Sequence, residues 1–284
     1  MKKKFLFIGN RFNVLGKMRE HGLKIVGILP LKDSYLEHEL IAEKITFDRF
    51  VSREELINQI KSIDFDILVS NGCPYILPIS KIKKPNQLFI NIHPSLLPDL
   101  RGVNPINGAI LFDRDAGVTC HLMDDGIDTG KIISQINLEK QQDLGLLYKM
   151  SFLAEGEVFV KAYERSFKPS QKKIKVTEPI YYTRKEGDMI INFNEDINSV
   201  VRRVRAFGIK SQGSYFNLNN KKITVLKADI IKNAFLVMEM QNRTIGEIVL
   251  KCENSIVIKH GNGLLLFSDI ITGFDFLKIG DHLL

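Results

Sequence analysis

Two short segments of the sequence carry side chains that could stabilise charge and move a proton. The first is Leu88-Phe-Ile-Asn-Ile-His-Pro-Ser-Leu-Leu-Pro98, where one residue separates the amide of Asn91 from the imidazole of His93. If residues 88–93 form a strand, both side chains lie on one face, because side chains alternate along a strand. An amide can donate a hydrogen bond to an oxyanion, and an imidazole can handle a proton. The ordinary alternative is a histidine at a strand end that bonds a backbone carbonyl.

The second segment is Met123-Asp-Asp-Gly-Ile-Asp-Thr-Gly130, in which two glycines bracket Asp128. It lies between the strand-like stretches 118–122 and 132–136. Glycine permits positive φ and a close approach of the backbone, so this stretch predicts a tight loop. Its carboxylate could meet the Asn91 and His93 face. Taken alone, the loop is also what a simple Asp-Gly turn looks like.

The first half of the chain alternates short apolar runs with helix-like patterns. The apolar runs are residues 5–8, 25–29, 65–69 and 88–92. Helices are expected at about 14–21, from Ser52 (with Glu55 as a capping box) to Lys61, and at 144–165. Short runs that are apolar on both faces suit strands covered by helices on both sides, which predicts a Rossmann-like, doubly wound and mostly parallel α/β sheet. Ligands of such sheets bind beyond the carboxyl ends of the strands, here just after residues 8, 69 and 92.

The pattern changes in the second half. Residues 168–178 contain one proline and four lysines and read as a linker, and a helix is expected at about 198–207. Short strand-like pieces follow at 223–226, 246–250, 255–258 and 264–267, separated by turn residues such as Asn219-Asn220 and Gly261-Asn262-Gly263. We therefore expect a first α/β domain at 1–175, a linker or helical connection at 176–212, and a small β-rich, barrel-like domain at 213–284.

The composition sets broad limits. Forty basic residues exceed thirty-three acidic ones, and the formal net charge of +7 favours an anionic partner without separating nucleic acid, nucleotide and solvated surface. Cys73, Cys120 and Cys252 share no metal-ligand spacing, which predicts reduced, buried cysteines in a cytoplasmic protein and no metal site. No stretch approaches ~18 apolar residues, so no membrane span is expected.

Together, the two chemical segments resemble the transferases that use N10-formyltetrahydrofolate. That family's pattern is Asn-x-His-Pro-Ser-Leu-Leu-Pro followed by an Asp-x-Gly turn, matched here by Asn91, 93–98 and 128–130. The resemblance covers most of residues 1–140. The final β-rich segment is similar to the small OB-like barrel of the family's longer members.

The resemblance implies transfer of a formyl group from N10-formyltetrahydrofolate to an amine, without a metal. Asn91 and His93 would stabilise the oxyanion, and Asp128 would hold His93 and help to take the amine proton. The family's folate pocket maps onto seven positions, whose ordinary role without the resemblance is core packing. They are Tyr75, Ile76, Leu77, Met123, Asp124, Asp125 and Ile127.

The acceptor favoured by the resemblance is a nucleotide-linked aminodideoxy sugar, of the kind used for bacterial surface glycans such as lipopolysaccharide and carried by thymidine diphosphate in some members. Methionyl initiator tRNA is the alternative acceptor, and hydrolysis of the formyl-folate is the alternative reaction. Gly9-Asn10-Arg11-Phe12 departs from the Gly-Thr-Pro of the tRNA enzymes, and the short, mixed-charge segment 30–36 departs from their long basic loop. Since phosphate contacts from Lys and Arg dominate nucleic-acid affinity, no nucleic-acid partner is expected.

Five residues are expected to contact this substrate. Asn10 and Arg101 could contact a phosphate or sugar, although Arg101 could equally be solvated surface. The others are aromatic side chains that could stack on a base, namely Tyr181, Tyr182 and Phe207. Core packing is the ordinary role for any one of these aromatic residues. Analogy with the family also predicts a homodimer and no membrane partner.

Overall fold

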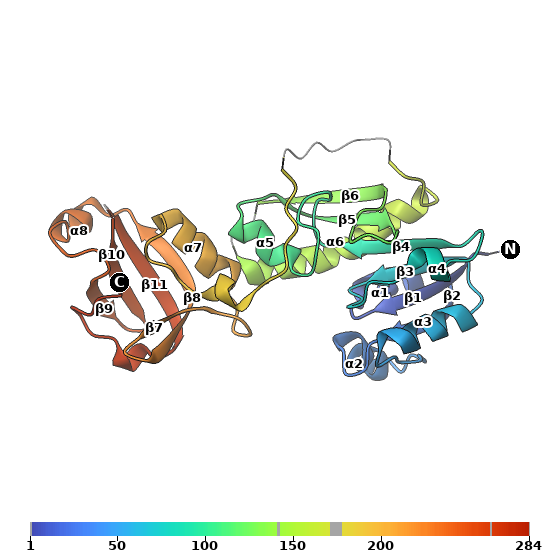
Figure 1. The fold of residues 1–284 in the computed structure, drawn as a ribbon, viewed down its shortest axis with the longest axis horizontal. Coiled ribbons are helices and arrows are strands. Elements are labelled where there is room, and N and C mark those ends of the chain that lie inside the picture. Colours follow the sequence, from blue (N-terminus) through green and yellow to red (C-terminus); the bar gives the residue numbers. More distant parts are fainter. Residues whose placement is uncertain (1, 141–142, 171–177, 262, 284) are drawn as a thin grey trace. The chain divides into compact units, whose positions relative to one another are not determined.

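The computed structural model describes residues 2–140, 143–170, 178–261 and 263–283. The chain forms two compact units, shown in Figure 1. The first unit comprises residues 1–105, 115–139 and 149–182, and the second comprises 106–114, 140–148 and 183–284. These boundaries differ from the expected ones. Residues 183–212 belong to the second unit, whereas they were expected to be part of a separate connection. The stretch 171–177, inside the expected linker, lies outside the described residues.

The first unit is built on a six-stranded sheet in the order β2-β1-β3-β4-β5-β6. Its strands are β1 (Lys4–Gly9), β2 (Lys24–Pro30), β3 (Ile67–Asn71), β4 (Leu88–His93), β5 (Ala116–Leu122) and β6 (Ile132–Glu139). Strands β1 to β4 are parallel, whereas β5 pairs antiparallel with both β4 and β6. The predicted mostly parallel, Rossmann-like sheet is confirmed.

Helices cover both faces of this sheet, because alternate residues of each central strand enter different cores. Phe5 and Phe7 of β1 pack in one cluster with α1 (Asn13–Glu20), α2 (Tyr35–Ala42) and α6 (Leu144–Glu164). The intervening residues of β1 pack on the other face with α3 (Arg53–Ser62) and α4 (Ile79–Ile82). Burial on both faces explains why these strands read as continuous apolar runs.

The second unit contains a five-stranded antiparallel sheet in the order β7-β8-β11-β10-β9. Its strands are β7 (Ser214–Leu218), β8 (Lys221–Ile231), β9 (Ile248–Cys252), β10 (Ser255–His260) and β11 (Gly263–Thr272). An OB-fold also has five strands. The predicted β-rich C-terminal region is therefore confirmed.

Helices and short 3-10 turns complete the second unit. They are α5 (Pro105–Leu111), η1 (Glu186–Met189), α7 (Ile197–Ala206), α8 (Ala234–Glu239) and η2 (Phe274–Phe276). Helix α7 buries Val200 and Val204 in the same core as Phe267 of β11. The sequence predicted α7 to within one residue at each end but missed the short helices, whose few residues give little periodic signal.

The cysteines differ in exposure. Cys120 is buried, as expected, whereas Cys73 is only half-buried and Cys252 is exposed at the end of β9. The prediction that all three are buried was wrong for Cys252, because a turn follows it directly and the strand ends there. Within the described residues, no helix is both long and apolar enough to cross a lipid bilayer.

Candidate active site

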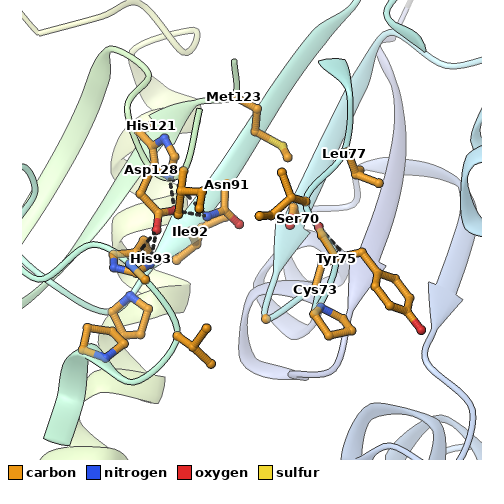
Figure 2. A pocket seen from close by; sticks show the side chains of 18 of the residues that line it. Ser70, Cys73, Tyr75, Leu77, Asn91, Ile92, His93, His121, Met123 and Asp128 are labelled. Carbon is orange, nitrogen blue, oxygen red and sulfur yellow. Dashed lines mark hydrogen bonds and ion pairs between the residues drawn. The ribbon is translucent and has the colours of Figure 1, made fainter. Parts of the chain in front are cut away.

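The carboxyl end of β4 presents Asn91 and His93 to one cavity (Figure 2). Strand β4 is hydrogen-bonded on both sides, by β3 and by β5, so its position in the sheet is fixed. The two side chains lie on the same face, as the strand alternation predicted.

The segment that follows β4 folds back over His93. The hydroxyl of Thr119 in β5 accepts a hydrogen bond from the Leu97 amide and donates one to the carbonyl of Ser95. This fold places the carbonyl oxygen of Leu100 2.9 Å from Nε2 of His93. Because a carbonyl can only accept, Nε2 carries the hydrogen and the ring is fixed with Nδ1 facing away from Leu100.

The Asp128 carboxylate lies against both predicted partners. Oδ2 is 3.5 Å from Nδ1 of His93, and Oδ1 is 3.4 Å from Nδ2 of Asn91. Oδ2 also accepts a hydrogen bond of 3.1 Å from the backbone amide of Gly102. The predicted convergence of an amide, an imidazole and a carboxylate is therefore confirmed.

The loop that carries Asp128 needs its glycine. A Cβ atom at Gly130 would lie 1.7 Å from the carbonyl oxygen of Leu122, so no other residue fits there without moving the backbone. Asp128 itself has φ of 53°, a left-handed conformation that Asp and Asn tolerate better than most residues. The Asp124 carboxylate fixes the loop by accepting hydrogen bonds from the Gly126 amide and the Thr129 hydroxyl.

His121 is a member of this cluster that the sequence analysis missed. It lies directly opposite Asn91 in the antiparallel pairing of β4 with β5. Its Nδ1 donates to the carbonyl of Leu122 at 2.8 Å, and its Nε2 lies 3.5 Å from Oδ1 of Asp128. The available signal was strand alternation in β5, but it needed the β4–β5 register, which the sequence does not state.

The amide of Asn91 is shared between two acceptors. Its Nδ2 lies 3.2 Å from Nε2 of His121 in addition to its contact with Asp128. In the tautomer with the hydrogen on Nδ1, Nε2 of His121 accepts from Asn91, and the two amide hydrogens of Asn91 have one partner each. A ring that carries a second hydrogen on Nε2 donates to Asp128 instead. Figure 2 shows the carbonyl oxygen of Asn91 pointing away from Asp128. In this geometry Asn91 can serve an oxyanion only by giving up one of these bonds.

The two central groups are both held in their deprotonated, basic forms. Burial of the His93 ring lowers its pKa, against the raising effects of Asp128 and of the Leu100 carbonyl. Burial of Asp128 alone would raise the pKa of its carboxyl, but the His121 hydrogen bond, the neighbouring histidines and the Gly102 amide lower that pKa to about 2. At neutral pH the site therefore contains a neutral imidazole beside an ionised carboxylate.

The cavity has a volume of about 390 Å³, and most of the predicted folate positions line it. The residues of that set in the wall are Tyr75, Ile76, Leu77, Met123, Asp124 and Ile127. Asp125 is the exception. Its carboxylate turns to the start of α4, where it accepts a hydrogen bond of 3.0 Å from the Ser80 amide.

The predicted substrate residues divide into two groups. Asn10 lines the cavity, and so does Tyr181, whose side chain is exposed. Arg101 is not among the lining residues, although its backbone bridges to that of Tyr181, and its contact with substrate stays a prediction. Tyr182 is only 6% exposed and Phe207 is 0% exposed, so neither ring offers a free face to a base, and these two assignments are corrected.

Arg11 is a cationic side chain at the cavity that the sequence analysis did not assign to the site. It follows β1, lines the wall, and forms an ion pair with the fully buried carboxylate of Glu155 in α6. Its guanidinium also lies 4.8 Å from the centre of the Phe152 ring. The sequence analysis named its neighbour Asn10 but missed Arg11, because only the fold brings Glu155 beneath it.

Residues 24–162 match the formyl transferase family, and residues 184–275 match the formyl transferase C-terminal domain. The two matches cover both halves of the chain in the expected order. The chain belongs to the formyl transferase family. Its cluster of Asn91, His93 and Asp128 lies inside the first matched region, so this formyltransferase carries its candidate active site in the N-terminal family domain.

Individual relatives of the formyltransferase fall into two kinds. Methionyl-tRNA formyltransferase of Syntrophus aciditrophicus is 26% identical, over 74% of this chain and 67% of its own length. Among solved structures, the sugar 3N-formyl transferase WlaRD, crystallised with dTDP and 5-N-formyl-THF, has a TM-score of 0.71 at 22% identity, covering 96% of this chain and 99% of its own. The Helicobacter canadensis N-formyltransferase, in complex with folinic acid and dTDP-3-aminofucose, has a TM-score of 0.70 at 21% identity, covering 95% and 100%.

Within the described residues, no group of three His, Cys, Asp or Glu side chains is arranged to hold a metal ion. The cluster at β4 and β5 is instead closed by its own hydrogen bonds.

Proposed function

We propose that this formyltransferase moves the formyl group of N10-formyltetrahydrofolate to the amine of a nucleotide-linked amino sugar. The observation that carries this proposal is the convergence of Asn91, His93 and Asp128 in one cavity beside an apolar wall. The cluster and the wall are needed together. The cluster can act only on a bound electrophile, and the apolar wall has no reactive group of its own.

The cavity fits the folate donor. Its volume of about 390 Å³ is within the usual range for a pocket that binds a small molecule. Ile76, Leu77 and Met123 offer apolar surface to a flat ring, and the two solved relatives bind folate derivatives. When bound, the formyl-folate supplies an electrophilic carbonyl carbon.

His93 and Asp128 together form an acceptor for the amine proton. Because Nε2 of His93 donates to Leu100, its Nδ1 presents a lone pair toward the Asp128 carboxylate at 3.5 Å. No hydrogen lies between these two acceptors while the ring is neutral. A proton delivered to Nδ1 would complete a charge-assisted bond with Asp128, so the pair gains its strongest interaction only when the amine has lost a proton.

Arg11, Asn10 and Tyr181 would hold the acceptor substrate. Arg11 and Asn10 lie at the end of β1, where ligands of such sheets bind, and a guanidinium suits a diphosphate. Tyr181 is 57% exposed and offers a ring for a base or sugar. WlaRD was crystallised with dTDP, and the Helicobacter canadensis enzyme is in complex with dTDP-3-aminofucose. These ligands favour a nucleotide-linked amino sugar as the acceptor.

The test is a panel of acceptors supplied with N10-formyltetrahydrofolate. The panel contains nucleotide-linked amino sugars with the amine at C-3 or C-4 and, separately, methionyl initiator tRNA, because several sequence relatives are methionyl-tRNA formyltransferases. We expect a formylated sugar nucleotide by mass spectrometry. Formylated tRNA with no sugar product would reject the proposed acceptor.

A reaction without any amine tests the hydrolase alternative. We expect the formyl-folate to be stable with the enzyme alone, and formyl loss to begin only when an amine is added. Release of formate at an undiminished rate in the absence of amine would assign the site to hydrolysis.

A further inference from the structure

The backbone of residues 99–102 contacts both members of the proton-handling pair. The His93 and Asp128 side chains point toward one another in Figure 2. The carbonyl oxygen of Leu100 lies 2.9 Å from Nε2 of His93, and the Gly102 amide donates to Oδ2 of Asp128 at 3.1 Å. We call residues 99–102 the catalytic loop. The bonds that hold this loop therefore decide the geometry of the pair.

Leu100 presents its carbonyl from a strained backbone conformation. Its φ is 53°, in the left-handed region that a leucine rarely adopts, and its side chain is buried. Strained backbone of this kind persists only where the surrounding structure holds it in place. The catalytic loop thus depends on contacts with other parts of the chain.

A distant segment of the same unit, residues 180–182, supplies such contacts. The Arg101 amide donates to the carbonyl of Ile180 at 3.1 Å, and the Tyr182 amide donates back to the carbonyl of Arg101 at 2.8 Å. The Val103 amide donates to the carbonyl of Tyr182 at 3.2 Å. We call residues 180–182 the strap. It pairs with the catalytic loop as a short strand would.

Asp99 fastens the strap to the strained residue. Its Oδ1 accepts hydrogen bonds from the Ile180 amide at 2.8 Å and from the Leu100 amide at 3.0 Å. The Asp99 carbonyl accepts from the Ser95 hydroxyl at 2.7 Å. Asp99 is buried and is not among the residues that line the cavity. Any effect of Asp99 on catalysis therefore passes through the backbone of the loop.

The position of the Leu100 carbonyl matters because the neutral His93 ring has two competing tautomers. With its hydrogen on Nε2 the ring donates to Leu100, and the lone pair of Nδ1 faces Asp128. With its hydrogen on Nδ1 the ring would instead form a charge-assisted bond with the Asp128 carboxylate. That second tautomer has no lone pair on Nδ1 to accept the amine proton. A well-placed Leu100 carbonyl is what favours the first.

We propose that Asp99 is a positioning residue for formyl transfer. By tying the strap to the catalytic loop, it keeps the hydrogen of the His93 ring on Nε2 and leaves Nδ1 free. The expected effect on the rate rests on the proposed function, whereas the tautomer is a property of the free enzyme. A merely structural Asp99 would contribute to stability without changing the tautomer of the folded protein.

The first test is NMR of the ring nitrogens of His93 in the full chain at neutral pH, without ligands, with the signals assigned by comparison with His93→Gln. We expect the hydrogen on Nε2 in the wild type and a substantial population with the hydrogen on Nδ1 in Asp99→Ala. Asp99→Asn retains an acceptor oxygen and should keep the wild-type tautomer.

The matched control is Asp66→Ala. The Asp66 carboxylate also accepts from a backbone amide far away in sequence, that of Lys4 at 2.8 Å, but it does not line the cavity. This variant loses a comparable bond and should leave the His93 tautomer unchanged. Thermal unfolding verifies that each variant is folded.

The second test is steady-state kinetics with the accepted amine. In Asp99→Ala we expect kcat to fall about tenfold while KM for the formyl-folate stays within about twofold of the wild type, and Asp99→Asn should recover most of the rate. Tyr181→Ala removes a cavity-lining side chain from the strap but none of its backbone bonds. It should raise KM for the acceptor and leave the tautomer unchanged.

These results separate the role of Asp99 from the proposed function. A wild-type His93 ring with its hydrogen on Nδ1 would overturn the proposal before any variant is made. A folded Asp99→Ala with the wild-type tautomer and kcat would also overturn it. If Asp99→Ala does not fold, Asp99→Ser replaces it, because its oxygen lies closer to the backbone and no longer reaches the Ile180 amide. If no acceptor is formylated, the proposed function fails, but the tautomer comparison still decides the role of Asp99.

Discussion

The two cavities of this formyltransferase are built from different kinds of secondary structure, and they hold different chemistry. The candidate active site lies where parallel strands end, so loops distant in sequence meet around His93 and Asp128. The cavity of the second unit, with a volume of about 510 Å³, is lined by α5, α7 and the end of β8, and its charges come mainly from one face of α7 and from residues that follow α5, β6 and β8. The first holds a neutral imidazole beside an ionised carboxylate, whereas the second is lined by both cationic side chains and carboxylates. The difference teaches that a sheet edge brings together groups from loops far apart in sequence, whereas a helix face presents groups that lie close together in sequence.

The largest expected effect is at the proton-handling pair. His93→Ala or Asp128→Asn should lower kcat by at least ~10²-fold, because each removes one half of the acceptor for the amine proton. Asn is chosen at position 128 because it tolerates the left-handed backbone there. Steady-state kinetics with the accepted amine, together with circular dichroism, measure the rate and the fold. Near-normal rates in both variants would remove the candidate site from catalysis.

His121 should have a smaller effect. His121→Ala removes the partner of Oδ1 of Asp128 and one acceptor of the Asn91 amide, so we expect kcat to fall about tenfold. The pKa of Asp128 should also rise, since the His121 hydrogen bond helps to lower it. Carboxylate titration by isotope-edited NMR distinguishes this from a purely structural defect. His38→Ala serves as a control in the same unit, outside the cavity.

The pH dependence gives a third measure of the same site. Because burial lowers the pKa of His93, its ring stays neutral until the pH falls below the ordinary value of 6.5. The proton acceptor must be neutral, so kcat/KM should stay constant as the pH is lowered to that value. Below it, kcat/KM should fall by up to about tenfold per pH unit. Asp128 stays ionised to a pH of about 2 and does not cause this decline. An acid limb centred clearly above 6.5, after correction for the amine's own titration, would contradict a neutral His93.

The smallest expected effect sharpens the contrast between the cavities. Arg202→Gln/Lys232→Ala should leave kcat/KM for a sugar nucleotide within about twofold of the wild type, since neither side chain lines the active site. The same variant assayed with methionyl initiator tRNA tests the alternative acceptor, because loss of phosphate contacts weakens nucleic-acid binding. A large loss with the sugar nucleotide would show that the two cavities do not act separately.

Much of the framework follows from local sequence. The apolar runs gave the four parallel strands, and Ser52 begins α3 as expected, with its hydroxyl accepting from the Glu55 amide at 3.2 Å. One detail of that capping box differed, since the Glu55 carboxylate accepts from Val51 instead of Ser52. Element type was predictable because burial on one or two faces imposes a periodicity that the sequence displays.

The site was predictable only in part. Asn91, His93 and Asp128 could be named from their segments, because strand alternation and a glycine-bracketed loop are local features. Tyr182 and Phe207 were assigned to substrate but are buried, since nothing local distinguishes an exposed aromatic side chain from a buried one. His121 and Arg11 were missed because only the tertiary structure brings them beside Asn91 and Glu155.

The sequence by itself determined the alternation of strands and helices, the polar groups at the end of β4 and the loop that carries Asp128. Only the tertiary structure decided that His121 faces Asn91, that Glu155 holds Arg11, and that five separated cations surround one cavity in the second unit. The physical reason is that periodicity is a property of consecutive residues. Register between strands and packing between helices depend instead on contacts between residues far apart in sequence.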